Sequence, residues 1–192
     1  MPRKAKKIPE VLTPDEQKLL LRQPNKRYPT GLRNLAMMTL MLDSGLRASE
    51  VLKLTLADIE WRAGKLKVRE GKGRKDRILW LSDNCLEILR LWKERRPEGT
   101  DLLFLTLDAK PIHGSYLRRM VKRYAKKAGI EKDVHPHTLR HSFATDFYRE
   151  TKNLRMVQSA LGHSDISTTQ IYTHIIDEEL EEAMRGFRRK RD

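Results

Sequence analysis

Apolar residues recur at helical spacing along most of this chain. Residues 32–42 (LRNLAMMTLML) are apolar nearly all round, which predicts a central buried helix, and Gly45 is placed to end it with a left-handed cap. The sequence TPDE at 13–16 is typical of a helix start, because it combines an N-cap, a first-turn proline and a capping-box glutamate. Further helices are predicted at 47–53, 82–92, 115–129, 137–150, 153–161, 167–175 and 177–187.

Short stretches of another kind interrupt this helical pattern. Residues 65–70 (KLKVRE) and 77–81 (RILWL) alternate or cluster apolar side chains on either side of GKGRKD at 71–76, which predicts a β-hairpin. Residues 102–105 (LLFL) are predicted as a further short strand. The sequence therefore predicts a mainly α fold with a small antiparallel β-sheet.

The length and the charge indicate a globular domain with an anionic partner. The chain has 192 residues, close to the size of one domain, and Lys plus Arg outnumber Asp plus Glu by 40 to 26, so the net charge is +14. Such a surplus favours a polyanion, because each cation that meets a phosphate releases a condensed counterion. A basic protein on a membrane surface would show the same surplus, so charge alone leaves both partners open.

The cysteine count and the apolar stretches indicate a compartment. Cys85 is the only cysteine, so no intrachain disulfide can form and a reducing compartment is expected. The longest apolar stretch, 35–42, is too short for a bilayer span. Residues 1–7 (MPRKAKK) resemble the n-region of a signal peptide, but no apolar segment follows them. We expect a cytoplasmic protein with a basic tail or linker over residues 1–10 and no membrane partner.

The predicted helix at 115–129 has an apolar side and a basic side. The apolar side carries Leu117, Met120, Val121, Tyr124 and Ala128. The other side, here called the basic ridge, carries Arg118, Arg119, Lys122, Arg123, Lys126 and Lys127. Such a ridge suits a phosphate backbone, and a merely solvated charged face is the open alternative.

Taken singly, the candidate reactive residues have ordinary structural explanations. Arg47 can pair with Glu50 near a helix start, and Lys72 lies in a Gly-Lys-Gly turn, where lysines are usually solvated. His137 and Arg140 are three residues apart, so they share one face of a helix and can form a surface hydrogen-bonded pair.

Four longer motifs together resemble the tyrosine recombinase family, the integrase and Xer-type proteins. The motifs are LDSGLRASE at 42–50, GKGRKDR at 71–77, HPHTLRHSFAT at 135–145 and LGHSDISTTQIYTH at 161–174. Four motifs in this order are far more specific than one short pattern, and the resemblance runs from about residue 12 to about residue 187. It implies the family's catalytic-domain fold over 11–176. It also implies a C-terminal helix and basic tail over 177–192, which docks on a neighbouring protomer in a tetramer on double-stranded DNA. Packing of this helix against its own chain is the open alternative.

The resemblance also assigns roles to single residues. It makes Arg47 and Arg140 the two arginines that hold the scissile phosphate, and Tyr172 the nucleophile. The other matched residues are His137 of the His-x-x-Arg element, Lys72 of the hairpin turn, His163 as a second histidine, and Glu50 as an acidic residue that supports the site. The implied reaction is site-specific DNA cleavage and rejoining through a 3′-phosphotyrosyl bond, without metal, ATP, cofactor or small-molecule substrate.

Elementary chemistry is consistent with this set of residues. Attack on a phosphodiester places negative charge on the non-bridging oxygens, which two guanidinium groups can hold in fixed geometry. A tyrosine hydroxyl has a reference pKa of about 10, so it needs a base and nearby positive charge, and His137 is the expected base. Lys72 can protonate the departing 5′ oxygen as general acid, and His163 can donate to the phosphate.

Two other functions stay open from the sequence. A metal-dependent nuclease could use His137 and His141 with His135 or Cys85, but no carboxylate cluster accompanies them and Arg140 would repel a cation. A DNA-binding module of the same fold without turnover is the second alternative. Family members usually have an N-terminal helical domain that closes around DNA. We expect no part of this chain to be that domain, so a fragment and a naturally short member both fit.

Overall fold

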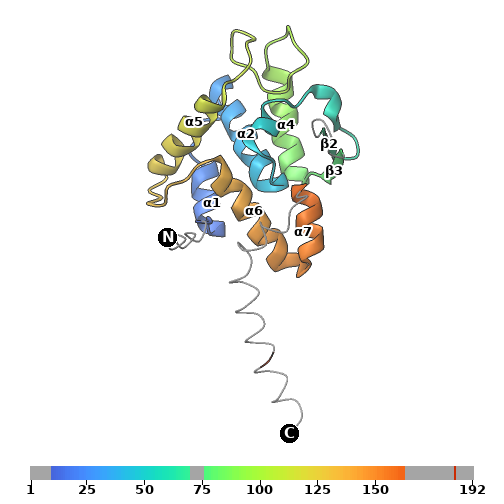
Figure 1. Ribbon diagram of the computed structural model, residues 1–192. Helices are drawn as coiled ribbons and strands as arrows, with labels where there is room; N and C mark the ends of the chain where they lie inside the picture. The colour runs from blue at the N-terminus through green and yellow to red at the C-terminus, as the bar shows by residue number, and fades with distance from the viewer. Residues whose placement is uncertain (1–9, 70–75, 163–183, 185–192) are drawn as a thin grey trace, which may run out of the picture. The chain divides into compact units, whose positions relative to one another are not determined.

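Helix α2 (Pro29–Ser44) lies at the centre of the structure, a computed structural model that describes residues 10–69, 76–162 and 184. It packs against α4 (Asp83–Arg95) and α6 (Pro136–Thr151), and Figure 1 shows it between them. Most of its side chains are buried, as the pattern of residues 32–42 predicted. The helix begins at Pro29, earlier than predicted, and ends at Gly45, whose φ of 63° confirms the left-handed cap.

Helix α1 (Pro14–Leu21) has the predicted capping box. The Thr13 hydroxyl accepts the Glu16 backbone N–H at 3.2 Å, and the Glu16 carboxylate accepts the Thr13 N–H at 2.7 Å. Residues at the start of α1 are joined to α6 far along the chain. The Leu12 N–H donates to the Ser142 hydroxyl at 2.8 Å, and the Gln17 amide donates to the Asp146 carboxylate at 2.7 Å.

The sheet is small and antiparallel, as predicted. Its strands β1 (Ile59–Glu60), β2 (Lys65–Val68) and β3 (Arg77–Trp80) follow one another in the order β1-β2-β3. Val68 is paired with Arg77 at the end of the hairpin, and alternate residues of β2 and β3 are buried. Strand β1 was not predicted. The strand predicted at 102–105 is wrong, because Leu102 and Leu105 form only isolated bridges, to Thr55 and Pro111.

The other helices follow the sequence pattern with shifted ends. Helix α3 (Ala48–Val51) is shorter than predicted and is followed by the short 3₁₀ helix η1 (Leu56–Asp58). Helices α5 (Gly114–Lys127) and α7 (Leu154–Leu161) lie close to their predicted positions. The helices predicted at 167–175 and 177–187 fall outside the described residues, apart from Met184. In the described part of the chain, no helix is long and apolar enough to span a membrane.

The core around α2 is apolar and well filled. Trp92 and Phe104 are its largest fully buried side chains, together with leucines and methionines of α2. The Trp92 indole N–H donates to the Leu103 carbonyl at 2.8 Å, so this buried polar group is satisfied. A filled core of this kind holds α2, α4 and α6 in fixed positions relative to one another. The candidate site lies at the C-terminal ends of α2 and α7.

Candidate active site

Glu50 and Arg47 are held together by the geometry of a helix start. Arg47 is the N-cap of α3, and its backbone N–H donates to Glu50 Oε2 at 2.7 Å. Its guanidinium Nη1 donates to Glu50 Oε1 at 2.9 Å. The Arg47 side chain is 28% exposed and the Glu50 side chain 12% exposed, so the carboxylate lies beneath the arginine. This arrangement presents part of the Arg47 guanidinium to solvent in a fixed position.

Arg140 reaches the same carboxylate from α6. Its Nη1 donates to the Gly45 carbonyl at 2.6 Å and lies 3.9 Å from Glu50 Oε2. Its Nη2 donates to the Leu161 carbonyl at 2.8 Å. Arg140 is 4% exposed, and its contacts join the C-terminal end of α2 to that of α7. The structure thus brings Arg47, Glu50 and Arg140 together, although Gly45 and Arg140 are 95 residues apart in sequence.

Arg77 is a third arginine at Glu50, and its sequence position alone did not predict a role for it. Its Nη1 and Nη2 donate to the two oxygens of Glu50 at 3.0 and 2.9 Å, a bidentate pair. Its Nε donates to the Ala160 carbonyl at 2.9 Å. A signal was present: Arg77 shares the buried face of the strand with Leu79, where alternation predicts an apolar residue. We call Glu50 with Arg47, Arg77 and Arg140 the Glu50 cluster.

The Glu50 carboxylate is ionised because of these arginines. Burial alone would raise the pKa of Glu50, but the hydrogen bond and positive charge of Arg77, with the hydrogen bonds from Arg47, outweigh burial. The pKa of Glu50 therefore lies below its ordinary value. A negative charge is therefore fixed next to the two arginines that the resemblance assigns to the phosphate.

His137 lies in the first turn of α6 with its side chain exposed. Partial loss of water around the ring, and then the positive charges of His135, Arg140, Arg118 and Arg47, lower the pKa of His137. The imidazole is therefore neutral at pH 7 and can accept a proton.

His141 lies one turn further along the same helix. Burial, followed by the charges of neighbouring basic groups, lowers the pKa of His141 to about 4. The described residues contain no group of three His, Cys, Asp or Glu side chains that could hold a metal ion. Cys85 is buried on α4, where burial and then Asp43 raise the pKa of its thiol.

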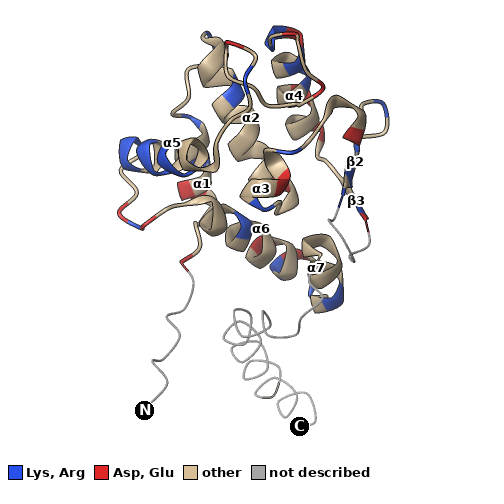
Figure 2. Cartoon of the chain, turned by 45° about the horizontal axis from the view of Figure 1, so that its top comes forward, with Lys and Arg blue, Asp and Glu red and all other residues tan. Residues whose placement is uncertain are grey.

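Helix α5 presents the basic ridge to solvent. Its Leu117, Met120 and Val121 are buried, which confirms the predicted apolar side. All six residues of the basic ridge are exposed, and Figure 2 shows their positive charge along α5. Lys122 pairs with Asp133 at 2.9 Å, an exposed pair that contributes little to stability. The helix contacts α3 and α6, and the charge of Arg118 reaches His137, so the ridge begins beside the site.

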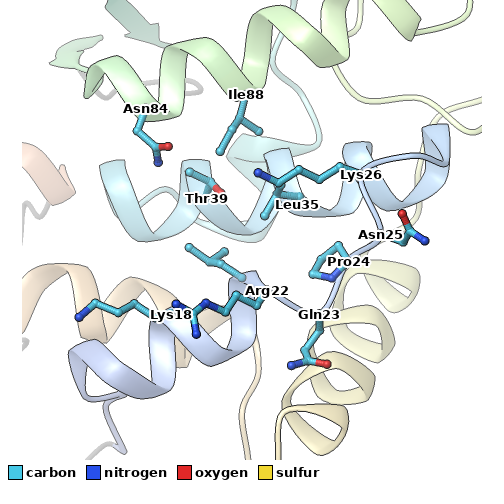
Figure 3. A pocket seen from close by; sticks show the side chains of 11 residues that line it. Lys18, Arg22, Gln23, Pro24, Asn25, Lys26, Leu35, Thr39, Asn84 and Ile88 are labelled. Atoms are coloured by element: carbon cyan, nitrogen blue, oxygen red, sulfur yellow. The ribbon is translucent and has the colours of Figure 1, made fainter.

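A separate cavity of about 610 Å³ lies between α1, the segment that follows it, the middle of α2 and the first half of α4. Figure 3 shows the basic side chains Lys18, Arg22 and Lys26 among those that line it. None of its lining residues belongs to the predicted site.

Of the residues predicted for the site, the structure brings together Arg47, Glu50, His137 and Arg140. Lys72, His163 and Tyr172 lie outside the described residues.

The fold and its motifs define the class of this protein. The chain belongs to the phage integrase family, whose family model matches residues 10–179. Its relatives are tyrosine recombinases: XerD of Staphylococcus saprophyticus is 42% identical over 180 residues, which cover 91% of this chain and 61% of XerD. XerD of Staphylococcus aureus shows the same identity and coverage. The chain therefore spans about three-fifths of the length of these relatives.

Solved structures confirm the predicted fold. The crystal structure of XerA recombinase matches with a TM-score of 0.82 and 33% identity, covering 97% of this chain and 66% of XerA. XerH site-specific recombinase, bound to a palindromic difH substrate in a post-cleavage complex, matches with a TM-score of 0.78 and 32% identity. That match covers 93% of this chain and 53% of XerH.

Proposed function

We propose that this chain is the catalytic part of a site-specific DNA recombinase, which cleaves and rejoins DNA through a covalent bond to Tyr172. One observation carries the proposal: Arg47 and Arg140, from separate parts of the chain, meet at Glu50, and His137 lies near enough for the charge of both arginines to act on its ring. Relatives that carry the name recombinase, and a XerH complex with its DNA substrate, support it.

The arginines act on the phosphate. Arg47 and Arg140 hold the non-bridging oxygens while Glu50 fixes the position of both guanidinium groups. Charge develops on those oxygens in the transition state, so each arginine lowers the barrier by about 3–4 kcal/mol if it behaves as one oxyanion-hole donor does. A lysine would serve less well, because it lacks the planar fork that matches two phosphate oxygens.

Proton transfers complete the step. The Tyr172 hydroxyl loses its proton to His137 and attacks phosphorus, while Lys72 protonates the departing 5′ oxygen. His163 donates a hydrogen bond to the phosphate. The products are a 3′-phosphotyrosyl bond and a free 5′ hydroxyl. Attack by another 5′ hydroxyl reverses the chemistry on a new strand, and the retained phosphodiester energy drives the rejoining.

The partner is double-stranded DNA. The basic ridge on α5 and the net charge of +14 provide cations for its phosphates. We propose a monomer in free solution and a tetramer on DNA, in which residues 177–187 dock on a neighbouring protomer. A single cysteine and a DNA substrate suit a reducing cytoplasm.

A trapping experiment tests the chemistry. A pool of DNA duplexes with randomised sequence carries a nick just 3′ of each candidate cleavage position, so that the released fragment diffuses away and the protein stays attached. We expect an SDS-stable adduct at a 3′ end that forms in EDTA and is absent in Tyr172→Phe. Tyr28→Phe, which alters an exposed tyrosine, is the matched control and should retain the adduct.

The same pool separates the alternatives. Binding without an adduct would support a DNA-binding module and refute the recombinase function. Cleavage that requires a metal ion and leaves no attached protein would support a nuclease. Sequencing the trapped duplexes identifies the DNA site, which gives a defined substrate for every later measurement.

A further inference from the structure

Arg77 joins three separate parts of the chain. It lies on β3, its guanidinium binds Glu50 on α3, and its Nε donates to the Ala160 carbonyl on α7. Its side chain is only 8% exposed, so it is covered by these neighbours rather than presented to a ligand. A buried arginine is costly unless its donors are satisfied, and here the carboxylate and the carbonyl accept from it.

The geometry at Glu50 links Arg77 to Arg47. Oε1 accepts from Arg47 Nη1 at 2.9 Å and from Arg77 Nη1 at 3.0 Å. Oε2 accepts from the Arg47 backbone at 2.7 Å and from Arg77 Nη2 at 2.9 Å. The bidentate pair therefore fixes the plane of the carboxylate that orients the Arg47 guanidinium.

Arg77 and Arg140 also meet at the end of α7. Ala160 accepts from Arg77, and the next carbonyl, Leu161, accepts from Arg140. Gly162 then ends the helix with a left-handed cap. The same two arginines thus hold both the carboxylate and the last turn of the helix.

We propose that Arg77 is a positioning residue, which acts through Glu50 to set the geometry of the Arg47 and Arg140 pair. The inference rests on the proposed function. An arginine serves this role better than a lysine, because a lysine ammonium cannot make a bidentate pair and also reach a separate carbonyl. Displacing a catalytic group by about 1 Å can cost on the order of 100-fold in rate.

A double-mutant cycle tests this. Adduct formation is measured as a first-order rate constant at saturating protein, on the duplex selected above, for Arg77→Met, Glu50→Gln and the double variant. We expect each single change to slow the reaction by about 100-fold with little change in the Kd for DNA. The double variant should be no slower than the slower single variant, because both changes break one unit. Arg77→Lys should recover part of the rate.

A second substrate separates the phosphate site from the hairpin that carries Lys72. Replacing the bridging 5′ oxygen by sulfur provides a leaving group that needs no proton. We expect this substrate to restore the rate of Lys72→Ala but not that of Arg77→Met. Restoration in Arg77→Met would overturn the inference, because Arg77 would then act through the proton donor.

Arg33→Met is the matched control for loss of a buried guanidinium. Arg33 is 4% exposed and donates to the Leu105 carbonyl and the Tyr116 hydroxyl, and neither belongs to the Glu50 cluster. The Arg33→Met variant should have a lower melting temperature but an unchanged rate of adduct formation.

If Arg77→Met does not fold, the cycle is made with Arg77→Lys. Additive losses with an active wild type overturn this inference alone, whereas a wild type that forms no adduct overturns the proposed function and this inference together.

Discussion

Replacing Gly45 by alanine should destabilise the fold and disturb the candidate site at once. Gly45 has a φ of 63°, and a Cβ there would lie 2.3 Å from Phe143 Cδ1 and 2.8 Å from Leu161 Cδ2. Both side chains are constrained, since Phe143 stacks on Phe147 with centroids 5.4 Å apart and Leu161 is 1% exposed. The Gly45 carbonyl also accepts from Arg140, so a shift of this turn moves the arginine.

The magnitude follows from two separate costs. The left-handed conformation costs about 1–2 kcal/mol for a residue with a Cβ. The steric overlap adds about 1–3 kcal/mol, the range for overpacked cores. Gly45→Ala should therefore lose about 2–5 kcal/mol, a large part of the roughly 5–15 kcal/mol that stabilises a domain.

Gly129 provides the matched control. It has a φ of 73°, and nothing lies within 4 Å of a Cβ built there, so Gly129→Ala bears only the conformational cost. Urea unfolding followed by circular dichroism gives the free energy of unfolding of both variants, provided that the m-value is unchanged. Equal losses at the two glycines would refute the steric argument.

Other predictions follow from the pKa shifts, a helix cap and the basic ridge. Folding lowers the pKa of Glu50, so the ionised carboxylate stabilises the fold fully above the ordinary carboxyl pKa of about 4.3. This stabilisation is lost as the pH falls through the lower pKa of the folded state. Between pH 7 and pH 3, the urea midpoint should therefore fall less in Glu50→Gln than in wild type. Because the pKa of His137 lies below its ordinary value, protonation of this imidazole should not slow adduct formation until the pH falls below about 6.5. The rate of adduct formation by wild type, measured as a function of pH, checks this. Thr13→Ala should cost about 1 kcal/mol of unfolding free energy through loss of the cap, measured by urea titration. Combining Lys126→Ala with Lys127→Ala should reduce the slope of log Kd against log salt by about 2 on any DNA sequence; an unchanged slope would place these lysines away from the phosphates.

The sequence predicted best those elements whose signals are local. The capping box at Thr13 and Glu16 and the stop at Gly45 require only neighbouring residues, and both lie where they were predicted. Strand β1 was missed because it is two residues long and takes its structure from pairing with β2. The run at 102–105 is apolar because it is buried in the core, not because it pairs in a sheet.

The candidate site could not be predicted from local spacing alone. Glu50 and Arg77 are 27 residues apart, and Gly45 and Arg140 are 95 apart, so no periodic pattern joins them. The family resemblance pointed to Arg47, Glu50 and Arg140 as one site. Arg77 was overlooked because its partner lies on another element, although its place on a buried strand face marked it as unusual.

The hydrogen bond from Leu12 to Ser142 has a consequence for how the chain is made. The two residues are 130 positions apart, so α1 leaves the ribosome long before its partner on α6 has been synthesised. At a synthesis rate of roughly 5–20 residues per second, this interval lasts roughly 7–26 s. Throughout it, Leu12 and Gln17 must find other partners, in water or on a chaperone, because the helix that will hold them does not yet exist.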